Sequence, residues 1–149
     1  MDDSLQTLVD ECARHSVWIL YTPLPGEVDI QKSPLGQSMP SDVFFLPNRH
    51  YGAPEVTAQA LVQTYAGKTG SVFIPGTLFD EKGNRKGRGG GWYDRFLPQL
   101  PKDWVRVGCL PEKLLSPTPL IPESWDQPMD WLLIETAKGY RTLQTEARG

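Results

Sequence analysis

The sequence has few cysteines and no long apolar run. Its two cysteines, Cys12 and Cys109, lie within apolar patterns without the spacing of metal ligands. This indicates buried packing residues and argues against a structural zinc site. No apolar segment approaches the roughly 20 residues that a membrane-spanning helix needs. The acidic start Met1-Asp2-Asp3 is unlike a signal peptide. These absences predict a cytoplasmic protein with no membrane partner.

The sequence also lacks an excess of positive charge. Its formal net charge is −3, so no global field would recruit nucleic acid, and we expect no nucleic-acid partner. The basic residues instead gather locally at Lys82, Arg85, Lys86 and Arg88. A chain of 149 residues with 39% hydrophobic residues is typical of one globular domain. We therefore expect a single domain over 1–149, as a monomer or small homo-oligomer, with a local site for a small charged ligand.

Strand-like and helix-like segments alternate along the chain. A continuous apolar run at 17–21 and mostly apolar segments at 43–46, 71–74, 105–109 and 131–134 predict strands. Spaced apolar residues predict helices from Ser4 and from Pro54, the second facing the core with Val56, Ala60, Leu61 and Tyr65, and a short helix at 92–97. Residues 31–41 are expected to form a surface loop. This alternation predicts an α/β fold with a mostly parallel sheet, whose ligands bind at the carboxyl ends of the strands.

The most informative segment is the glycine run that follows the third predicted strand. Gly87, Gly89, Gly90 and Gly91 stand after three basic residues and directly before the short helix at 92–97. Glycine lets backbone N–H groups approach an anion closely, and a helix start adds partial positive charge. The segment therefore predicts a phosphate-binding loop, which points to a nucleotide.

Other interpretations of this segment carry different functions. An arginine-glycine tract for RNA would repeat in a low-complexity chain, whereas this one occurs once between a predicted strand and helix. A Walker A loop would end in Gly-Lys-Ser/Thr, which is absent here. A plain glycine-rich hairpin remains open as an alternative.

Wider sequence similarity makes the prediction more specific. Ile74-Pro75-Gly76-Thr77-Leu78-Phe79-Asp80, Gly83-Asn84-Arg85 and Gly87 through Leu97 closely resemble the signature of the 5-formyltetrahydrofolate cyclo-ligase family, also called 5,10-methenyltetrahydrofolate synthetase. The segments 24–29, 107–110, 125–130 and 132–136 are similar to further parts of that family. The resemblance implies a three-layer αβα, Rossmann-like fold of the CoA transferase-like type.

The resemblance also implies a reaction and its participants. In that family, ATP phosphorylates the formyl oxygen of 5-formyltetrahydrofolate, ring closure expels phosphate, and the products are 5,10-methenyltetrahydrofolate, ADP and phosphate. The implied partners are ATP, Mg²⁺ and a reduced folate. The residues implied to bind ATP are Arg85, Lys86, Gly87, Arg88, Gly89, Gly90, Gly91, Trp92 and Tyr93. Among these, Arg88 and Tyr93 are the implied catalytic residues.

The same comparison implies metal and folate ligands. Asp94 and Asp126 would hold Mg²⁺, which prefers hard oxygen ligands. Glu27 would bind the pterin or its formyl group, assisted by Trp92. Each residue has a structural alternative: Asp94 as a helix-start acid or partner of Arg95, Asp126 as a turn residue, and Glu27 as a solvated loop carboxylate. Trp92 and Tyr93 would equally suit a core position.

One departure from the family pattern leaves two functions open. Family members usually begin with a helix whose lysine and arginines reach the ATP phosphates, but residues 1–13 here contain no basic residue. Arg14 is the nearest candidate replacement. The chain is therefore either an active cyclo-ligase or a relative that keeps a nucleotide or phosphate site without this reaction.

Two further pairs of residues bear on ligand binding. His15 and His50 show no nucleophile or metal partner in the sequence. Glu27 and Asp29 follow the first predicted strand, where they would face a ligand.

Overall fold

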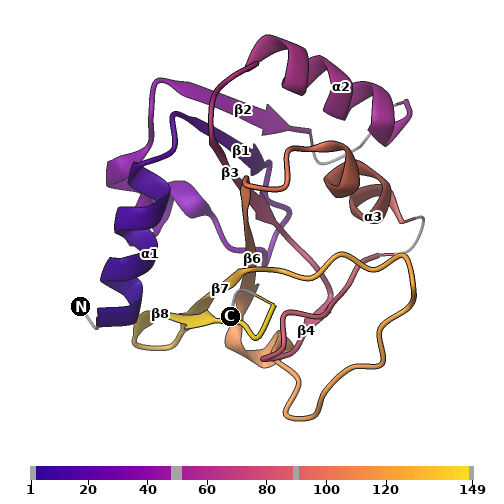
Figure 1. Cartoon of the computed structure of the whole chain (residues 1–149). Helices are drawn as coiled ribbons and strands as arrows, with labels where there is room; N and C mark the ends of the chain where they lie inside the picture. The colour runs from indigo at the N-terminus through magenta and orange to yellow at the C-terminus, as the bar shows by residue number, and fades with distance from the viewer. Residues whose placement is uncertain (1–2, 48–51, 89–90, 148–149) are drawn as a thin grey trace.

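Parallel strands form the centre of the structure, a computed structural model that describes residues 3–47, 52–88 and 91–147. These residues form a six-stranded sheet in the order β2-β1-β3-β6-β7-β8 (Figure 1). Every neighbouring pair is parallel except β7 and β8, which are antiparallel. The strands are β1 (Val17–Tyr21), β2 (Asp42–Leu46), β3 (Gly70–Ile74), β6 (Val105–Pro111), β7 (Trp131–Thr136) and β8 (Gly139–Gln144). The predicted α/β fold with a mostly parallel sheet is confirmed.

The central strands are mostly apolar because both faces of the sheet are covered. All five residues of β1 are buried, and so are all five of β3. Side chains alternate between the faces: Val17 and Ile19 join one core, whereas Trp18 and Leu20 join the other. A buried parallel strand therefore reads as a continuous apolar run instead of an alternating one.

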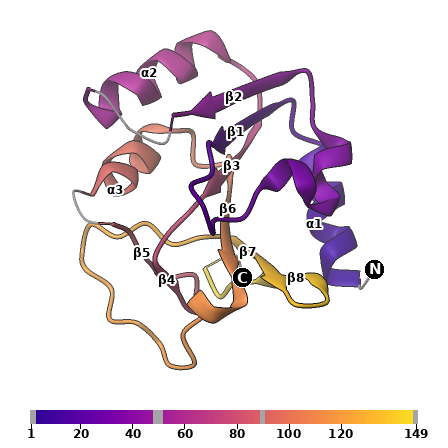
Figure 2. The same cartoon turned by 180° about the vertical axis from the view of Figure 1, so that it is seen from behind.

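Helices cover the two faces of this sheet. On one face lies α1 (Asp3–Ala13), whose Leu5, Leu8 and Cys12 pack into the core. On the other lie α2 (Pro54–Thr64) and α3 (Trp92–Phe96), followed by the 3₁₀ turn η3 (Leu97–Gln99). Figure 2 shows the same three layers from behind, with α1 on the opposite side of the sheet from α2 and α3. The structure thus has three layers: helix, sheet and helix.

The predicted inner face of α2 is wrong in part. Val56 is 66% exposed and Ala60 is also exposed, whereas Ala58 and Leu61 are buried. Tyr65 packs only partly buried against this core. The helix has a weak apolar stripe, so spacing alone identified Leu61 correctly but put Val56 and Ala60 on the inner face in place of Pro54 and Ala58.

The segment 31–41, predicted to be a surface loop, contains local structure. It includes the 3₁₀ turns η1 (Ile30–Lys32) and η2 (Pro34–Ser38), each begun by a capping side chain. Ile30 and Leu35 are 2% and 0% exposed and pack beside α1. These turns therefore complete the layer that α1 begins.

A small hairpin and an edge strand were not predicted. Strands β4 (Leu78–Phe79) and β5 (Arg85–Lys86) pair antiparallel, and β8 follows β7, beyond the last strand predicted from the sequence. Phe79 anchors the hairpin in the core, because it is 0% exposed and a Cβ added to Gly108 would lie 2.6 Å from its ring. The hairpin thereby carries Arg85 and Lys86 to the carboxyl ends of the parallel strands.

A last 3₁₀ turn, η4 (Glu112–Leu114), follows β6. Among the described helices, none is long and apolar enough to cross a membrane.

Candidate active site

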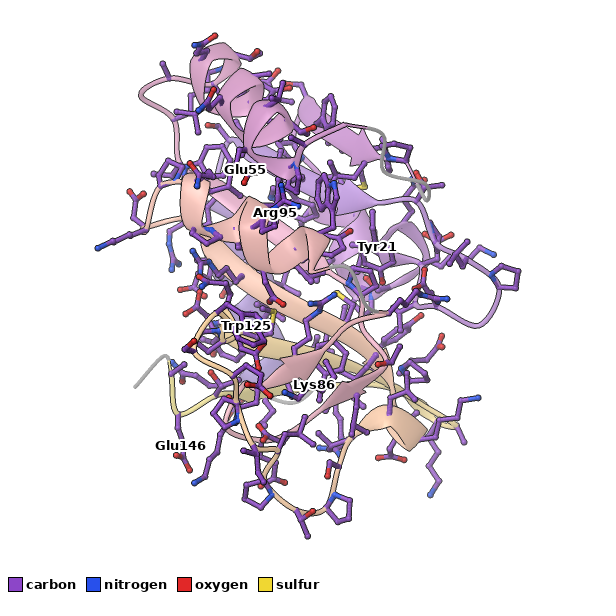
Figure 3. The ribbon with its side chains drawn as sticks, turned by 90° about the vertical axis from the view of Figure 1, so that its right-hand side faces the viewer. Tyr21, Glu55, Lys86, Arg95, Trp125 and Glu146 are labelled. Atoms are coloured by element: carbon purple, nitrogen blue, oxygen red, sulfur yellow. The ribbon has the colours of Figure 1, made fainter. Side chains whose placement is uncertain are left out.

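A cavity of about 360 Å³ lies at the carboxyl ends of the parallel strands. Its wall includes Tyr21 and Thr22 at the end of β1, Pro47 after β2, and Pro75 and Gly76 after β3. This is the edge where open α/β sheets bind ligands, and the volume suits a small molecule. Figure 3 shows Tyr21, Lys86 and Trp125 around this region, contributed by β1, β5 and the long loop before β7.

The cavity is rich in charged side chains from distant parts of the sequence. Its charged lining residues are Glu27, Arg85, Lys86, Arg88, Asp94, Glu123 and Asp126. The list includes every charged residue that the family resemblance assigns to ATP, Mg²⁺ or the folate. Among residues 3–47, 52–88 and 91–147, however, no three His, Cys, Asp or Glu side chains group to hold a metal ion. A metal here would therefore need oxygen atoms from a ligand or from water to complete its coordination.

The β4–β5 hairpin is held in position by Asp80. Its Oδ1 accepts hydrogen bonds from the N–H groups of Lys82 (2.9 Å) and Asn84 (3.0 Å). Its Oδ2 accepts from the Asn84 amide (2.9 Å) and from the Leu120 N–H (2.7 Å). Because Leu120 belongs to the loop before β7, one carboxylate fixes the hairpin and that loop together.

Arg85 enters the cavity as a largely buried cation. Its residue is 8% exposed, its Nε donates to the Pro75 carbonyl at 2.6 Å, and its guanidinium lies 4.9 Å from the centre of the Tyr93 ring. Burial lowers the pKa of Arg85, against the opposing effect of Tyr93 and of the carboxylates of Asp94 and Asp126. A guanidinium held in this way stays charged and is set to bind an anion.

Lys86 and Asp126 form an ion pair on the cavity wall. The Lys86 Nζ lies 3.1 Å from the Asp126 Oδ2 and donates to the Ile121 carbonyl at 3.0 Å. Burial opposes ionisation of Asp126, but the hydrogen bond from the Glu123 N–H and the Lys86 ammonium together hold its pKa below the usual value. Asp126 is therefore ionised at neutral pH.

Asp94 is a second carboxylate at the cavity wall, and it interacts electrostatically with Arg85 and Asp126. Burial raises the pKa of Asp94, Arg85 opposes this shift, and the Asp126 carboxylate adds to it. Two carboxylates that influence each other at the wall of one cavity are the type of donor set that binds a divalent cation. Arg95, the alternative partner of Asp94, instead binds Glu55 through two nitrogen atoms at 3.0 and 3.3 Å.

Glu27 and Arg88 form a second ion pair across the cavity. The Arg88 guanidinium donates to Glu27 Oε2 at 3.0 Å, and Glu27 Oε1 accepts from the Leu24 N–H at 2.8 Å. The Glu27 side chain is only 13% exposed, whereas that of Arg88 is 60% exposed. Glu27 is therefore a fixed carboxylate and not the solvated loop residue of the alternative interpretation.

The glycine run lies next to a hairpin. Residues 78–86 form the β4–β5 hairpin, and Gly87 and Gly91 lie beyond it and line the cavity. A Cβ on Gly87 would lie 3.1 Å from the Arg85 guanidinium, so a side chain there would press on this cation. Gly91 precedes α3 with a φ of +64°. The predicted ligands Gly89 and Gly90 lie outside the described residues.

Comparison with known proteins identifies the family of this chain. A model of the 5-formyltetrahydrofolate cyclo-ligase family matches residues 11–135. The chain belongs to this family. A curated relative, the 5-formyltetrahydrofolate cyclo-ligase of Haemophilus influenzae, is 41% identical over 64 residues, covering 42% of this chain and 34% of the relative. The match thus spans about a third of that relative's length.

Solved structures show the same fold. The 5,10-methenyltetrahydrofolate synthetase of Mycoplasma pneumoniae has a TM-score of 0.55 at 20% identity, covering 87% of this chain and 79% of that one. That of Aquifex aeolicus has a TM-score of 0.55 at 21% identity, covering 93% of this chain and 80% of the other. At this level of identity the likeness concerns the fold alone.

The aromatic residues of this cyclo-ligase family member serve both cavity and core. Trp92 and Tyr93 line the cavity, yet Tyr93 is only 7% exposed. Trp92 stacks on Phe96, with ring centres 4.7 Å apart. Burial raises the pKa of Tyr93, so its hydroxyl stays protonated and can donate a hydrogen bond. Trp92 and Tyr93 therefore pack against the core and line the cavity at the same time, so the ligand-binding and core interpretations do not exclude each other.

Several other predictions do not match the cavity. Asp29 is not among its lining residues and instead caps η1 by accepting from the Gln31 N–H at 3.0 Å. Arg14 follows α1 and precedes the amino end of β1. It therefore lies at the amino ends of the parallel strands, whereas the cavity lies at their carboxyl ends. Arg14 therefore does not replace the basic residues of the family's first helix. Cys12 and Cys109 are buried and free, as predicted, and His50 lies outside the described residues.

Trp125, Tyr21 and Asp80 have roles that the sequence analysis missed. Trp125 and Tyr21 line the cavity, and Asp80 positions the hairpin. Asp80 carries a local signal, since Asp followed by Gly and Asn three and four residues later is a typical turn pattern. Tyr21 ends an apolar strand and Trp125 lies in a segment that resembles the family, but only the fold shows that both line one cavity.

Proposed function

We propose that this chain is an ATP- and Mg²⁺-dependent ligase that converts 5-formyltetrahydrofolate to 5,10-methenyltetrahydrofolate, releasing ADP and phosphate. The main support is one observation: three basic side chains, Arg85, Lys86 and Arg88, line the same cavity as the carboxylates Asp94 and Asp126. Membership of the cyclo-ligase family makes this reaction the first to test.

The residues present fit Mg²⁺. Asp94 and Asp126 offer hard oxygen ligands, and Mg²⁺ is commonly bound through one or two carboxylates together with phosphate oxygens and water. Burial raises the pKa of Asp94, Arg85 opposes this shift, and Asp126 adds to it, so a bound cation would reduce the repulsion between the two carboxylates. In our proposal these two residues hold the metal.

The residues also fit a polyphosphate. The buried Arg85, the half-buried Lys86 and the exposed Arg88 provide positive charge at the cavity wall, and Gly87 and Gly91 also line the cavity. Mg-ATP supplies the phosphoryl group that makes a formyl oxygen able to leave. The contribution of the chain is to position the reactants and neutralise charge, which are the main needs of phosphoryl transfer.

Glu27 is suited to orient the folate. Its Oε1 is fixed by the Leu24 N–H and its Oε2 by Arg88, so its position depends on a residue that we assign to the phosphates. Trp92 and Tyr93 provide the aromatic wall, and the Tyr93 hydroxyl stays protonated. In this proposal Arg88 joins the two halves of the cavity and acts on the transferring group.

A second function is favoured by one observation. Helix α1 contains no basic residue, and Arg14 lies at the amino ends of the parallel strands, whereas the cavity lies at their carboxyl ends. A relative that binds a nucleotide without carrying out the ring closure would have these features. ATP binding without product formation is its distinguishing property.

The direct test is to incubate the purified protein with ATP, Mg²⁺ and 5-formyltetrahydrofolate, and to follow the methenyl product by absorbance and ADP by chromatography. We expect equal amounts of both, loss of both with EDTA, and recovery with Mg²⁺. ATP binding without product would support the second function. Binding of neither ligand would contradict both functions.

Arg88 and Arg95 provide a matched pair of variants for this assay. Both are exposed arginines in an ion pair with a glutamate, but only Arg88 lines the cavity. Arg88→Gln should lower kcat by about a hundredfold, whereas Arg95→Gln should leave it unchanged. Equal rates in the two variants would rule out the role assigned to Arg88.

A further inference from the structure

Trp125 differs from the buried tryptophans of the protein. Trp18, Trp104 and Trp131 are at most 3% exposed, whereas Trp125 is 59% exposed and lines the cavity. A large apolar ring left in water beside a charged cavity is costly unless a ligand covers it. Figure 3 shows Trp125 on the side of the cavity away from Tyr21.

The turn that carries Trp125 is held firmly. The Asp126 N–H donates to the Glu123 carbonyl at 3.0 Å, and the Glu123 N–H donates to Asp126 Oδ2 at 2.8 Å. Lys86 bonds both Asp126 and the Ile121 carbonyl, which ties the loop to the β4–β5 hairpin. The indole therefore extends from a fixed backbone, and a ligand would bind it without first ordering the loop.

The surroundings of Trp125 indicate the chemistry of its ligand. The adjacent residue Asp126 forms an ion pair with Lys86. The positive charge of Arg85 also helps to lower the pKa of Asp126. A flat apolar surface next to two cations suits a molecule with a planar aromatic ring joined to an anionic chain. A purine nucleotide has both parts, because its base stacks on aromatic rings and its phosphates bind cations.

We propose that Trp125 is the surface on which the adenine base of ATP stacks, an inference that rests on the nucleotide half of the proposed function. The folate is the less favoured occupant of this side, because Glu27, which we assign to the folate, is contributed by the segment after β1 and pairs with Arg88. Trp125 thus determines affinity for the base, while Lys86 and Arg85 determine affinity for the phosphates.

The test measures binding of Mg-ATP, Mg-tripolyphosphate and 5-formyltetrahydrofolate by calorimetry, for the wild type, Trp125→Ala and Trp125→Phe. Tripolyphosphate has the charges of ATP without the base. Trp125→Ala should raise the Kd for ATP about tenfold and leave the Kd for tripolyphosphate and folate unchanged. Trp125→Phe keeps an aromatic face and should bind ATP within about threefold of the wild type.

Fluorescence gives a second measurement that does not depend on activity. ATP should quench tryptophan emission in the wild type, and most of the quenching should be lost in Trp125→Phe, because Trp18, Trp104 and Trp131 are buried away from the ligand. Any quenching that remains is assigned to Trp92, which also lines the cavity. Tripolyphosphate should quench much less. Thermal melting of each variant checks that it is folded.

Four results would overturn the inference. Unchanged ATP affinity in Trp125→Ala would show that the base binds elsewhere. Weakened folate binding with normal ATP binding would assign Trp125 to the folate. Equal weakening of ATP and tripolyphosphate would show that the indole only supports the loop. Absence of ATP binding in the wild type would contradict the proposed function as well, which separates the two failures.

Discussion

The two ends of the parallel strands are built differently. At the amino end, Trp104 is 1% exposed and packs so closely on β3 that a Cβ on Gly70 would lie 2.7 Å from its ring. Its Nε1 donates to the Lys68 carbonyl at 3.1 Å. At the carboxyl end, charged side chains surround a cavity of about 360 Å³. One end is closed by apolar packing and the other is kept open by hydrogen-bonded charges.

This difference indicates where stability and ligand binding reside. Close apolar packing leaves no room for a larger side chain, so changes at the amino end should lower the free energy of unfolding. Partly exposed charges contribute little to stability, so changes at the carboxyl end should mainly affect ligands. Substitutions at the two ends should therefore have separable effects.

The largest expected effect is on catalysis, from Asp94→Asn. Loss of one charged ligand should reduce the rate of methenyl formation by at least about a hundredfold, with no loss of thermal stability. Asp103→Asn, an exposed position just before β6 at the amino end, is the control and should retain the full rate. Similar rates in the two variants would remove Asp94 from the site.

At the amino end, Gly70→Val should destabilise the protein by about 3 kcal/mol. The added methyl groups would overlap the Trp104 ring, which is too deeply buried to move aside. Urea unfolding followed by fluorescence measures the change. Where the variant remains folded, its Kd for Mg-ATP should equal that of the wild type. A Gly70→Val variant as stable as the wild type, or one with weakened ATP binding, would contradict the assignment of stability to the amino end and ligand binding to the carboxyl end.

Asp80→Asn tests the hydrogen bonds that hold the carboxyl end open. Burial opposes ionisation of Asp80, but bonds from the Asn84 side chain and from the N–H groups of Leu120, Asn84 and Lys82 lower its pKa below 3.8. A lowered carboxyl pKa stabilises the folded state above the ordinary pKa, and this stabilisation is lost as the pH falls through the folded value. The variant should be about 1 to 3 kcal/mol less stable at pH 7.

The pH dependence distinguishes this cause from a general packing defect. The difference in unfolding free energy between the wild type and Asp80→Asn should shrink as the pH falls below about 4. Urea unfolding at a series of pH values measures it. A difference that is constant with pH would mean that ionisation of Asp80 is not what matters.

The smallest effects come from two lysines that each pair with an aspartate. Lys68 binds Asp42 at 2.8 Å at the amino end, and Lys86 binds Asp126 at 3.1 Å at the carboxyl end. Lys86→Gln should weaken ATP binding about tenfold, whereas Lys68→Gln should leave it unchanged. Both should alter stability by less than about 1 kcal/mol. Calorimetry would refute the distinction if both lysines affected ATP equally.

The sequence predicts the packed parts of this molecule better than its polar parts. The continuous apolar run at 17–21 predicts β1, and the mostly apolar segment at 71–74 predicts all of β3 except Gly70, because both faces of these strands are buried. Strand β8 was missed since it is a polar, half-exposed edge strand. The inner face of α2 was misplaced because a short helix with few large apolar residues leaves its orientation to tertiary packing.

The candidate site shows the same limit. The glycines and cations from Arg85 to Gly91 predict a phosphate-binding loop because they adjoin one another in the sequence, and the family resemblance adds Asp94. The pairing of these cations with Glu27 and Asp126 follows only from the fold, since the Arg88–Glu27 and Lys86–Asp126 contacts join residues 61 and 40 positions apart. Trp125 could not be predicted, because its importance lies in exposure at the wall of a cavity.

The most direct test of the carboxyl-end site is to map amide chemical shifts while Mg-ATP is added to isotope-labelled protein. We predict shifts at Arg85, Gly87, Asp94, Trp125 and Asp126, and none at Thr69, Trp104 or Arg14. Shifts that cluster at the amino end of the strands, with the carboxyl end unchanged, would contradict the location of the site.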